Sequence, residues 1–208
     1  PMKRDYLSTS ALKAFAKSPN HYLQYVSEQR LEPTPAMIFG SAVHCHILEP
    51  NEFDARYFVA PQIDRRTKAG REKYAALQKE HEGKEILNAK DWERLQLVDH
   101  AIRSNSQAMD ILNGATATEQ DKTAPIEGIP FRGIADIVGA NWVADLKTTT
   151  NASPDGFGRS ATNLGYHLQG AAYCALWQVP HFYWIAVETD APWNVQVYRQ
   201  HPDALAKS

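Results

Sequence analysis

Two acidic residues in apolar surroundings are the residues of this sequence best suited to chemistry. Asp136 lies within the apolar run 134–138, and Asp145 lies within 142–148, with Lys147 two residues further on. A hairpin that pairs Asp136 with Asp145 would bring their Cβ atoms to about 5 Å. Two negative charges at this distance repel each other unless a cation or a shared proton lies between them. The pattern therefore predicts the outline of a metal-dependent site that cleaves phosphodiester bonds.

The Asp-x-Lys tripeptide by itself is weak evidence, because a solvated salt bridge on a surface strand looks the same. Its neighbours Val143 and Leu146 favour a buried strand, and a buried charge needs a partner or a metal ion. Side chains alternate along a strand, so Asp145 and Lys147 are expected to point the same way.

Glu119 and His44 are two further candidates. Glu119 is a third acid, in the β-like run before Asp136, where an exposed edge-strand charge is the alternative. His44 lies in an apolar, helix-like run, where a structural histidine is the alternative. His46 is two residues away and does not share its helix face, so the two histidines do not predict a paired zinc site.

A downstream helix carries another polar group of side chains. Gln169 and Tyr173 are four residues apart and share one helix face, with Tyr166 one turn earlier. Small residues between them, 170–172, would allow close approach to a sheet or to a DNA backbone. Plain helix packing with a polar rim is the alternative.

Positive charge gathers in the segment 61–73, which is expected to be an exposed loop leading into a helix. Its basic residues outnumber the acids Asp64 and Glu72, and they are a candidate clamp for DNA phosphates, with a mobile solvated loop as the alternative. The basic residues are Arg65, Arg66, Lys68, Arg71 and Lys73.

Composition sets the frame for these candidates. The 208 residues, 43% of them hydrophobic, predict a single domain over 1–208, with a helical part over about 1–114 and a sheet core over about 115–200. A net charge of −2 excludes a strongly basic nucleic-acid binder, so DNA contact must come from a local patch. Two cysteines are too few for a disulfide framework or a four-thiolate metal site. Without a long apolar run or a signal peptide, a soluble, cytoplasmic protein is expected.

The order of predicted elements favours an α/β (α+β) fold. Hydroxyl residues at 8–10 predict the start of a helix. At the beginning of the chain, Pro1 before Met2 is typical of a cloning remnant. The polar end, 202–208, could open a further helix, so the natural protein is expected to extend at both ends. Predicted helices cover 37–48, 74–112 and 164–177; predicted strands cover 115–120, 123–126, 129–138, 142–148, 182–188 and 195–198; a loop is predicted at 154–158.

Taken together, these residues resemble the RecB-like branch of the PD-(D/E)xK nuclease superfamily, and within it the RecE-type exonucleases (exodeoxyribonuclease VIII) of phages and prophages. The resemblance rests on the order and spacing of separated blocks and weakens over 51–115. The blocks are 7–12 with 18–19, 39–44 with 47–50, 132–136, 145–149, and Tyr166 with Gln169 and Tyr173. It implies a restriction-endonuclease-like core, with a central mixed sheet flanked by helices and an N-terminal helical elaboration.

The resemblance also implies a metal site. Asp136, Asp145 and the Leu146 backbone carbonyl would bind one or two Mg²⁺ ions, with Mn²⁺ as a substitute, and His44 would bind metal or phosphate. Glu119 matches a less regular acidic position, so its place among the metal ligands carries over more weakly. An aspartate at 145 replaces the commoner glutamate, a change that RecE-type members accept.

Lys147, Gln169 and Tyr173 would complete the catalytic set. Lys147 would orient the attacking water; a role as base needs its pKa lowered far below ~10.4, and we favour the role of a positive charge. Gln169 and Tyr173 would line the DNA strand beside the scissile bond, with Tyr166 close by.

The implied activity is exonucleolytic cleavage of linear double-stranded DNA from 5′ ends. The implied partners are double-stranded DNA ends and a single-strand-annealing recombinase, and the implied assembly is a homo-oligomeric ring in the cytoplasm of a bacterial host, encoded by a phage or prophage. Three alternatives remain: a CRISPR-associated RecB-like nuclease, an endonuclease, or a catalytically idle DNA-binding relative. Two cysteines argue against the first, since such nucleases usually carry four around an iron–sulfur cluster.

Overall fold

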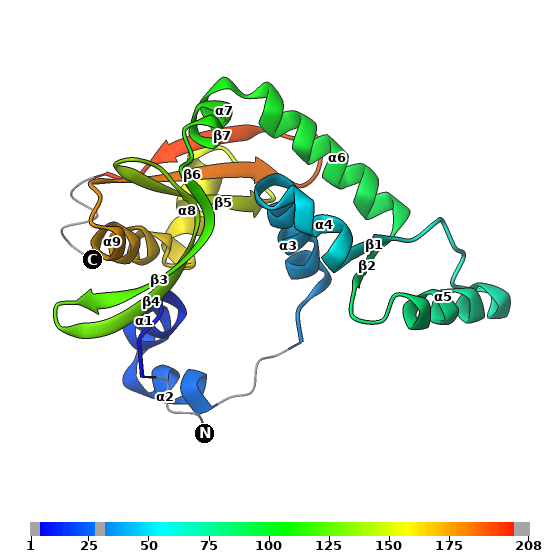
Figure 1. Cartoon of the computed structure of the whole chain (residues 1–208), viewed down its shortest axis with the longest axis horizontal. Coiled ribbons are helices and arrows are strands. Elements are labelled where there is room, and N and C mark those ends of the chain that lie inside the picture. Colours follow the sequence, from blue (N-terminus) through cyan, green and yellow to red (C-terminus); the bar gives the residue numbers. More distant parts are fainter. Residues whose placement is uncertain (1–4, 28–31, 202–208) are drawn as a thin grey trace.

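A five-stranded mixed sheet with helices on both faces forms the centre of the molecule (Figure 1). The computed structural model describes residues 5–27 and 32–201. The chain ends, where an extension and a further helix were expected, lie outside the described residues. Within the described ranges, no helix combines the length and apolar character needed to cross a membrane.

Four helices open the chain, and side-chain caps fix where two of them begin. The Ser8 hydroxyl accepts a hydrogen bond from the Ala11 N–H, and the Thr34 hydroxyl accepts one from the Met37 N–H. A proline in the first turn costs no helical hydrogen bond, because that N–H would have no partner anyway. The helices are α1 (Thr9–Lys17), α2 (Pro19–Ser27), α3 (Pro35–Leu48) and α4 (Pro50–Arg56).

The continuous helical segment predicted over 74–112 is wrong in detail. The structure has α5 (Lys68–Glu80), α6 (Ala89–Ser104) and α7 (Ser106–Asn113) in this region. Short strands β1 (Tyr57–Val59) and β2 (Glu85–Leu87) pair in parallel at the base of an arm that carries α5 (Figure 1). The predicted helix is interrupted before α6 and before α7, because the side chains of Asn88 and Asn105 cap the starts of these two helices.

The main sheet has the order β3-β4-β5-β6-β7, in which β5 and β6 are parallel and the other pairs are antiparallel. Two separate strands were predicted over 115–126, but one strand covers the region, because β3 pairs with β4 along its length. An ion pair between Asp121 and Arg132 joins the two strands at the predicted break. The strands are β3 (Ala117–Ile126), β4 (Ile129–Val138), β5 (Trp142–Thr149), β6 (His181–Glu188) and β7 (Val195–Arg199).

Residues 154–158 form a helix rather than the predicted loop. They open α8 (Pro154–Asn163), which is followed by α9 (Tyr166–Trp177). The residues Pro154 and Gly158 are typical of a loop. However, Pro154 lies in the first turn, where the Ser153 hydroxyl accepts a hydrogen bond from the Gly156 N–H.

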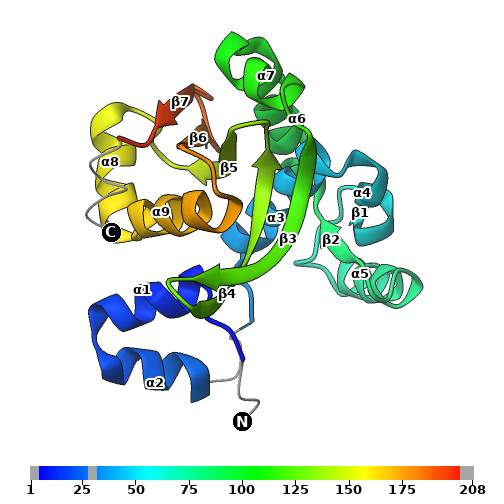
Figure 2. The same ribbon diagram turned by 60° about the vertical axis from the view of Figure 1, so that its left-hand side comes forward.

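Apolar side chains on both faces bury β5 and β6. On one face Leu146 and Ile185 pack with α3 and α6; on the other, Val143 and Phe182 pack with α9. The predicted class, a central mixed sheet flanked by helices, is confirmed. A second view places α1 and α9 on one side of the sheet and α3 and the α5 arm on the other (Figure 2). A polar side chain on β5 therefore needs a specific partner.

Candidate active site

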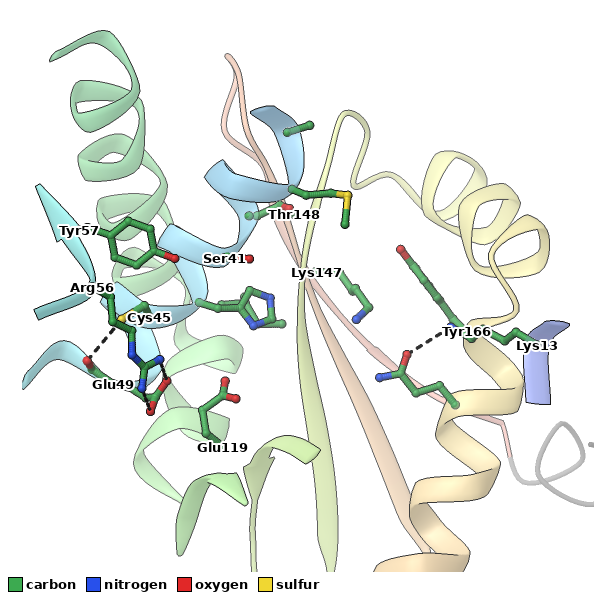
Figure 3. A pocket seen from close by; sticks show the side chains of 16 residues that line it. Lys13, Ser41, Cys45, Glu49, Arg56, Tyr57, Glu119, Lys147, Thr148 and Tyr166 are labelled. Carbon is green, nitrogen blue, oxygen red and sulfur yellow. Dashed lines mark hydrogen bonds and ion pairs between the residues drawn. The ribbon is translucent and has the colours of Figure 1, made fainter. Parts of the chain in front are cut away.

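A cavity of about 610 Å³ opens between α3 and α4 on one side and α1 and α9 on the other. Lys147 lies at its centre, with Glu49, Arg56 and Glu119 on one wall and Tyr166 and Lys13 on the other (Figure 3). Both walls and the centre therefore carry charged side chains.

Asp136 lies where the β4–β5 ladder ends. The backbone pairs are Val138 with Val143 and Ile137 with Ala144, and the same register continued by one residue sets Asp136 opposite Asp145. The Oδ2 atom of Asp136 accepts a hydrogen bond from the Leu146 N–H at 2.8 Å. The carboxylate thus satisfies a buried backbone donor next to the point where the two strands part.

Asp145 is 1% exposed and is held from two sides. Its Oδ1 accepts a hydrogen bond from Gln169 Nε2 at 2.5 Å, and its Oδ2 lies 2.5 Å from Lys147 Nζ. The Lys147 ammonium is the partner of Oδ2, which within the described residues is otherwise a buried oxygen without a hydrogen bond. A buried carboxylate oxygen of this kind favours a cation, and Lys147 supplies one.

His44, Glu119 and Asp136 bring ligand atoms within 4.8 Å of one another. His44 Nδ1 lies 3.4 Å from Asp136 Oδ2. Gly40, one turn before His44, allows α3 to lie close to β5, because a Cβ at this position would lie 3.2 Å from the Thr148 hydroxyl. Glu119 has a φ of 48°, a left-handed conformation that is uncommon for residues other than glycine.

The electrostatics of the cluster disfavour negative charge. Burial raises the pKa of Asp136 well above its ordinary value, and the Asp145 charge raises it further. Burial, followed by Glu49 and Asp145, raises the pKa of Glu119 to about 6. Burial lowers the pKa of His44, which favours a neutral imidazole with a free lone pair.

This donor set fits a divalent cation. It combines crowded carboxylates and a neutral imidazole, and a cation would relieve the repulsion that raises the acid pKa values. Asp145 is not one of the three residues whose ligand atoms cluster, because Lys147 and Gln169 hold it. The predicted ligand set, including the Leu146 carbonyl, stays a prediction.

A substitution at Glu119 gives a prediction about pH. The folded state keeps the Glu119 proton up to about pH 6, whereas an unfolded chain releases it near ~4.3. The contribution of Glu119 to stability is therefore fully present below pH ~4.3 and is lost as pH rises through about 6. Gln does not titrate. The Tm of metal-free Glu119→Gln should therefore rise relative to the Tm of the metal-free unsubstituted protein as the pH increases from 4 to 7. A constant difference in Tm would contradict the raised pKa.

Gln169 and Tyr173 share a helix face but reach different partners. Gln169 contacts Asp145, whereas the Tyr173 hydroxyl donates to the Ile134 carbonyl at 2.8 Å. Tyr173 lines a separate cavity with Ser8, Thr9 and Arg132. Within the described residues, the first cavity thus holds Gln169 and Tyr166 but not Tyr173.

The basic segment lies on the arm, and none of its residues lines the first cavity. Arg66 pairs with Asp64, Lys68 lies 3.9 Å from Glu72, and the Arg65 guanidinium lies 4.3 Å from the Tyr74 ring centroid. All of its basic side chains, including Arg71, are exposed. The phosphate clamp stays a prediction, separated from the acids.

Sequence reasoning missed three charged residues of the cavity: Lys13, Glu49 and Arg56. Arg56 Nη1 and Nη2 donate to the two Glu49 oxygens at 2.7 and 2.9 Å. Lys13 comes from α1, far from the acids in sequence. The resemblance block 7–12 ends just before Lys13, and the block 47–50 contains Glu49, but no local pattern distinguishes the three residues from surface charges.

Comparison with known proteins places this geometry in a family. A model of a PDDEXK-like domain of unknown function (DUF3799) matches residues 8–208. No curated protein matches the chain. A candidate exonuclease from Eubacterium rectale has a similar crystal structure, with a TM-score of 0.69, 15% identity, and coverage of 98% of this chain and 75% of that chain.

A phage-related exonuclease from Haemophilus somnus is a more distant match, with a TM-score of 0.38, 15% identity, and coverage of 68% of this chain and 76% of that chain. At such identities, the Eubacterium rectale structure supports the fold alone. The family model covers nearly the whole chain, and we conclude that this protein belongs to the PDDEXK-like domain family DUF3799, within the PD-(D/E)xK nuclease superfamily.

Proposed function

We propose that this protein is a divalent-metal-dependent exodeoxyribonuclease that hydrolyses phosphodiester bonds of linear double-stranded DNA. The observation that carries the proposal is the buried pair Asp136 and Asp145, with Lys147 beside them at an open cavity. Buried acids that repel each other are costly to keep unless they bind a cation. Membership in the superfamily supports the same chemistry.

The chain's own residues would divide the work. Asp136, Asp145, the Leu146 carbonyl and His44 would hold a divalent ion, which would supply Lewis-acid polarisation of the phosphate and lower the pKa of a water molecule. Lys147 holds and orients the attacking water as a cation: burial lowers its pKa, but Asp145 and Asp136 outweigh this and raise it above the ordinary value. A charged ammonium also stabilises the negative charge that develops on the phosphate.

Gln169 acts on the position of Asp145. Its amide N–H donates to Oδ1, which leaves Oδ2 directed to Lys147. A carboxylate fixed in this way needs no reorganisation during the reaction.

The finer proposals rest on the RecE-type resemblance. These are Mg²⁺ as the preferred ion, with Mn²⁺ as a substitute, 5′-to-3′ polarity, a role in phage-type recombination with a single-strand-annealing recombinase, a homo-oligomeric ring and a cytoplasmic location. The single domain over 1–208 is part of the same proposal.

Incubation with DNA labelled at either end tests the proposal. We expect loss of linear duplex DNA with Mg²⁺, no loss with EDTA, and early release of the 5′ label. Covalently closed circular DNA serves as the control and should stay intact. Cutting of circles would indicate an endonuclease, and intact linear DNA under all conditions would indicate an idle relative.

A further inference from the structure

Lys13 is a half-buried ammonium on the cavity wall opposite Arg56 (Figure 3). Its Nζ lies 3.5 Å from Gln169 Oε1 and 5.3 Å from the centroid of the Tyr166 ring. Within residues 5–27 and 32–201, Lys13 forms no ion pair with a carboxylate. Arg56, the cation on the opposite wall, is already paired with Glu49.

The backbone holds Lys13 in this place. Leu7, just before α1, bridges to Phe131 of β4, and hydrogen bonds of 2.8 Å join Leu7 to Pro130 and Arg132. This bridge ties the start of α1 to the sheet, and α1 then packs against α9. The bridge thus fixes the backbone from which the Lys13 side chain extends, and the contacts with Gln169 and Tyr166 direct its ammonium into the cavity.

An unpaired cation in this setting is unfavourable without a ligand. Burial, followed by the Lys147 charge, lowers the pKa of Lys13 to about 8, and Asp145 offsets this only in part. Two ammonium groups, Lys13 and Lys147, each lie 5.3 Å from the Tyr166 ring centroid. A second negative group would therefore be attracted to this wall.

Lys13 does not reach the acids directly. The Gln169 amide stands between them, with Oε1 toward Lys13 and Nε2 toward Asp145. The chemistry of both neighbours requires this orientation, because an ammonium only donates hydrogen bonds and a carboxylate only accepts them. The anion that Lys13 binds must then lie beside the group held at Asp145 rather than in its place.

We propose that Lys13, braced by the Tyr166 ring, binds the phosphodiester adjacent to the scissile one on the strand being cleaved. The inference rests on the proposed cleavage of DNA, since only a polyanionic strand offers a second phosphate next to the first. Lys13 is then a binding residue that sets how the strand enters the cavity, and it also restrains the Gln169 amide.

Binding of end-containing duplex DNA in EDTA, measured across a salt series, tests the assignment. Each phosphate contact contributes about 0.7–0.9 to the slope of log K against log salt. Lys13→Met should make the slope less steep by about that amount, whereas Lys13→Arg should keep it. Lys17→Met is the matched control, because Lys17 is exposed on the last turn of the same helix.

The outcomes separate the two proposals. If the unsubstituted protein cleaves DNA but Lys13→Met and Lys17→Met bind with equal slopes, the subsite is wrong and the proposed function stands. If the unsubstituted protein neither binds nor cleaves DNA, both are wrong. Equal Tm values for Lys13→Met and the unsubstituted protein would show that a shallower salt dependence reflects the loss of a phosphate contact rather than unfolding of the variant.

Discussion

Replacement of Asp136 by Asn is expected to abolish DNA cleavage while leaving the metal-free protein at least as stable as before. Asn removes the negative charge that burial and Asp145 disfavour. Its side-chain oxygen can still accept the Leu146 N–H, which Asp136 accepts at 2.8 Å. Release of label from DNA measures the loss of activity, and the Tm in EDTA measures the stability of the fold. The two measurements therefore distinguish a catalytic defect from unfolding.

Asp136→Ala is the control for this result. It also abolishes cleavage, but it leaves the buried Leu146 N–H without its acceptor, which costs about 1–3 kcal/mol. We expect a lower Tm for Asp136→Ala than for Asp136→Asn. Normal turnover by either variant would overturn the assignment of Asp136, and equal Tm values would show that the Leu146 contact contributes little.

The centre of the site was predictable because its determinants are local. Asp136 and Asp145 lie on neighbouring strands joined by a short turn, so spacing alone sets which residues face each other. Their apolar neighbours Ile137 and Leu146 indicate burial, and both are buried. The α/β (α+β) class followed from the order of the predicted helices and strands, and the central mixed sheet flanked by helices followed from the resemblance.

The surroundings of the site were less predictable because tertiary contacts decide them. No local signal places Lys13 beside Gln169, since α1 reaches α9 through a strand bridge at Leu7. The φ of 48° at Glu119 turns a residue that reads as an edge-strand charge toward His44. Capping residues were also misjudged: the Ser153 hydroxyl begins a helix where Pro154 suggested a loop.

The ion pair between Lys147 and Asp145 is expected to carry the largest effect on stability. Lys147→Met keeps the apolar stem but removes the ammonium 2.5 Å from Asp145 Oδ2. Removing one partner of a buried pair costs about 3–5 kcal/mol, because the other charge is left uncompensated. The Lys147 side chain is 22% exposed, so we expect the lower end, about 3 kcal/mol, for the metal-free protein.

The double variant Asp145→Asn with Lys147→Met is expected to recover most of that stability without recovering activity. It removes both charges together, and the Asn oxygen can still accept the Gln169 N–H that Asp145 accepts at 2.5 Å. Unfolding in urea, with EDTA present, of the unsubstituted protein, Asp145→Asn, Lys147→Met and the double variant gives the coupling free energy between the two positions. A double variant less stable than Lys147→Met would show that the uncompensated charge of Asp145 is not the cause of the loss. Equal stability of Lys147→Met and the unsubstituted protein would show that solvent in the cavity, rather than the Lys147 ammonium, compensates the charge of Asp145.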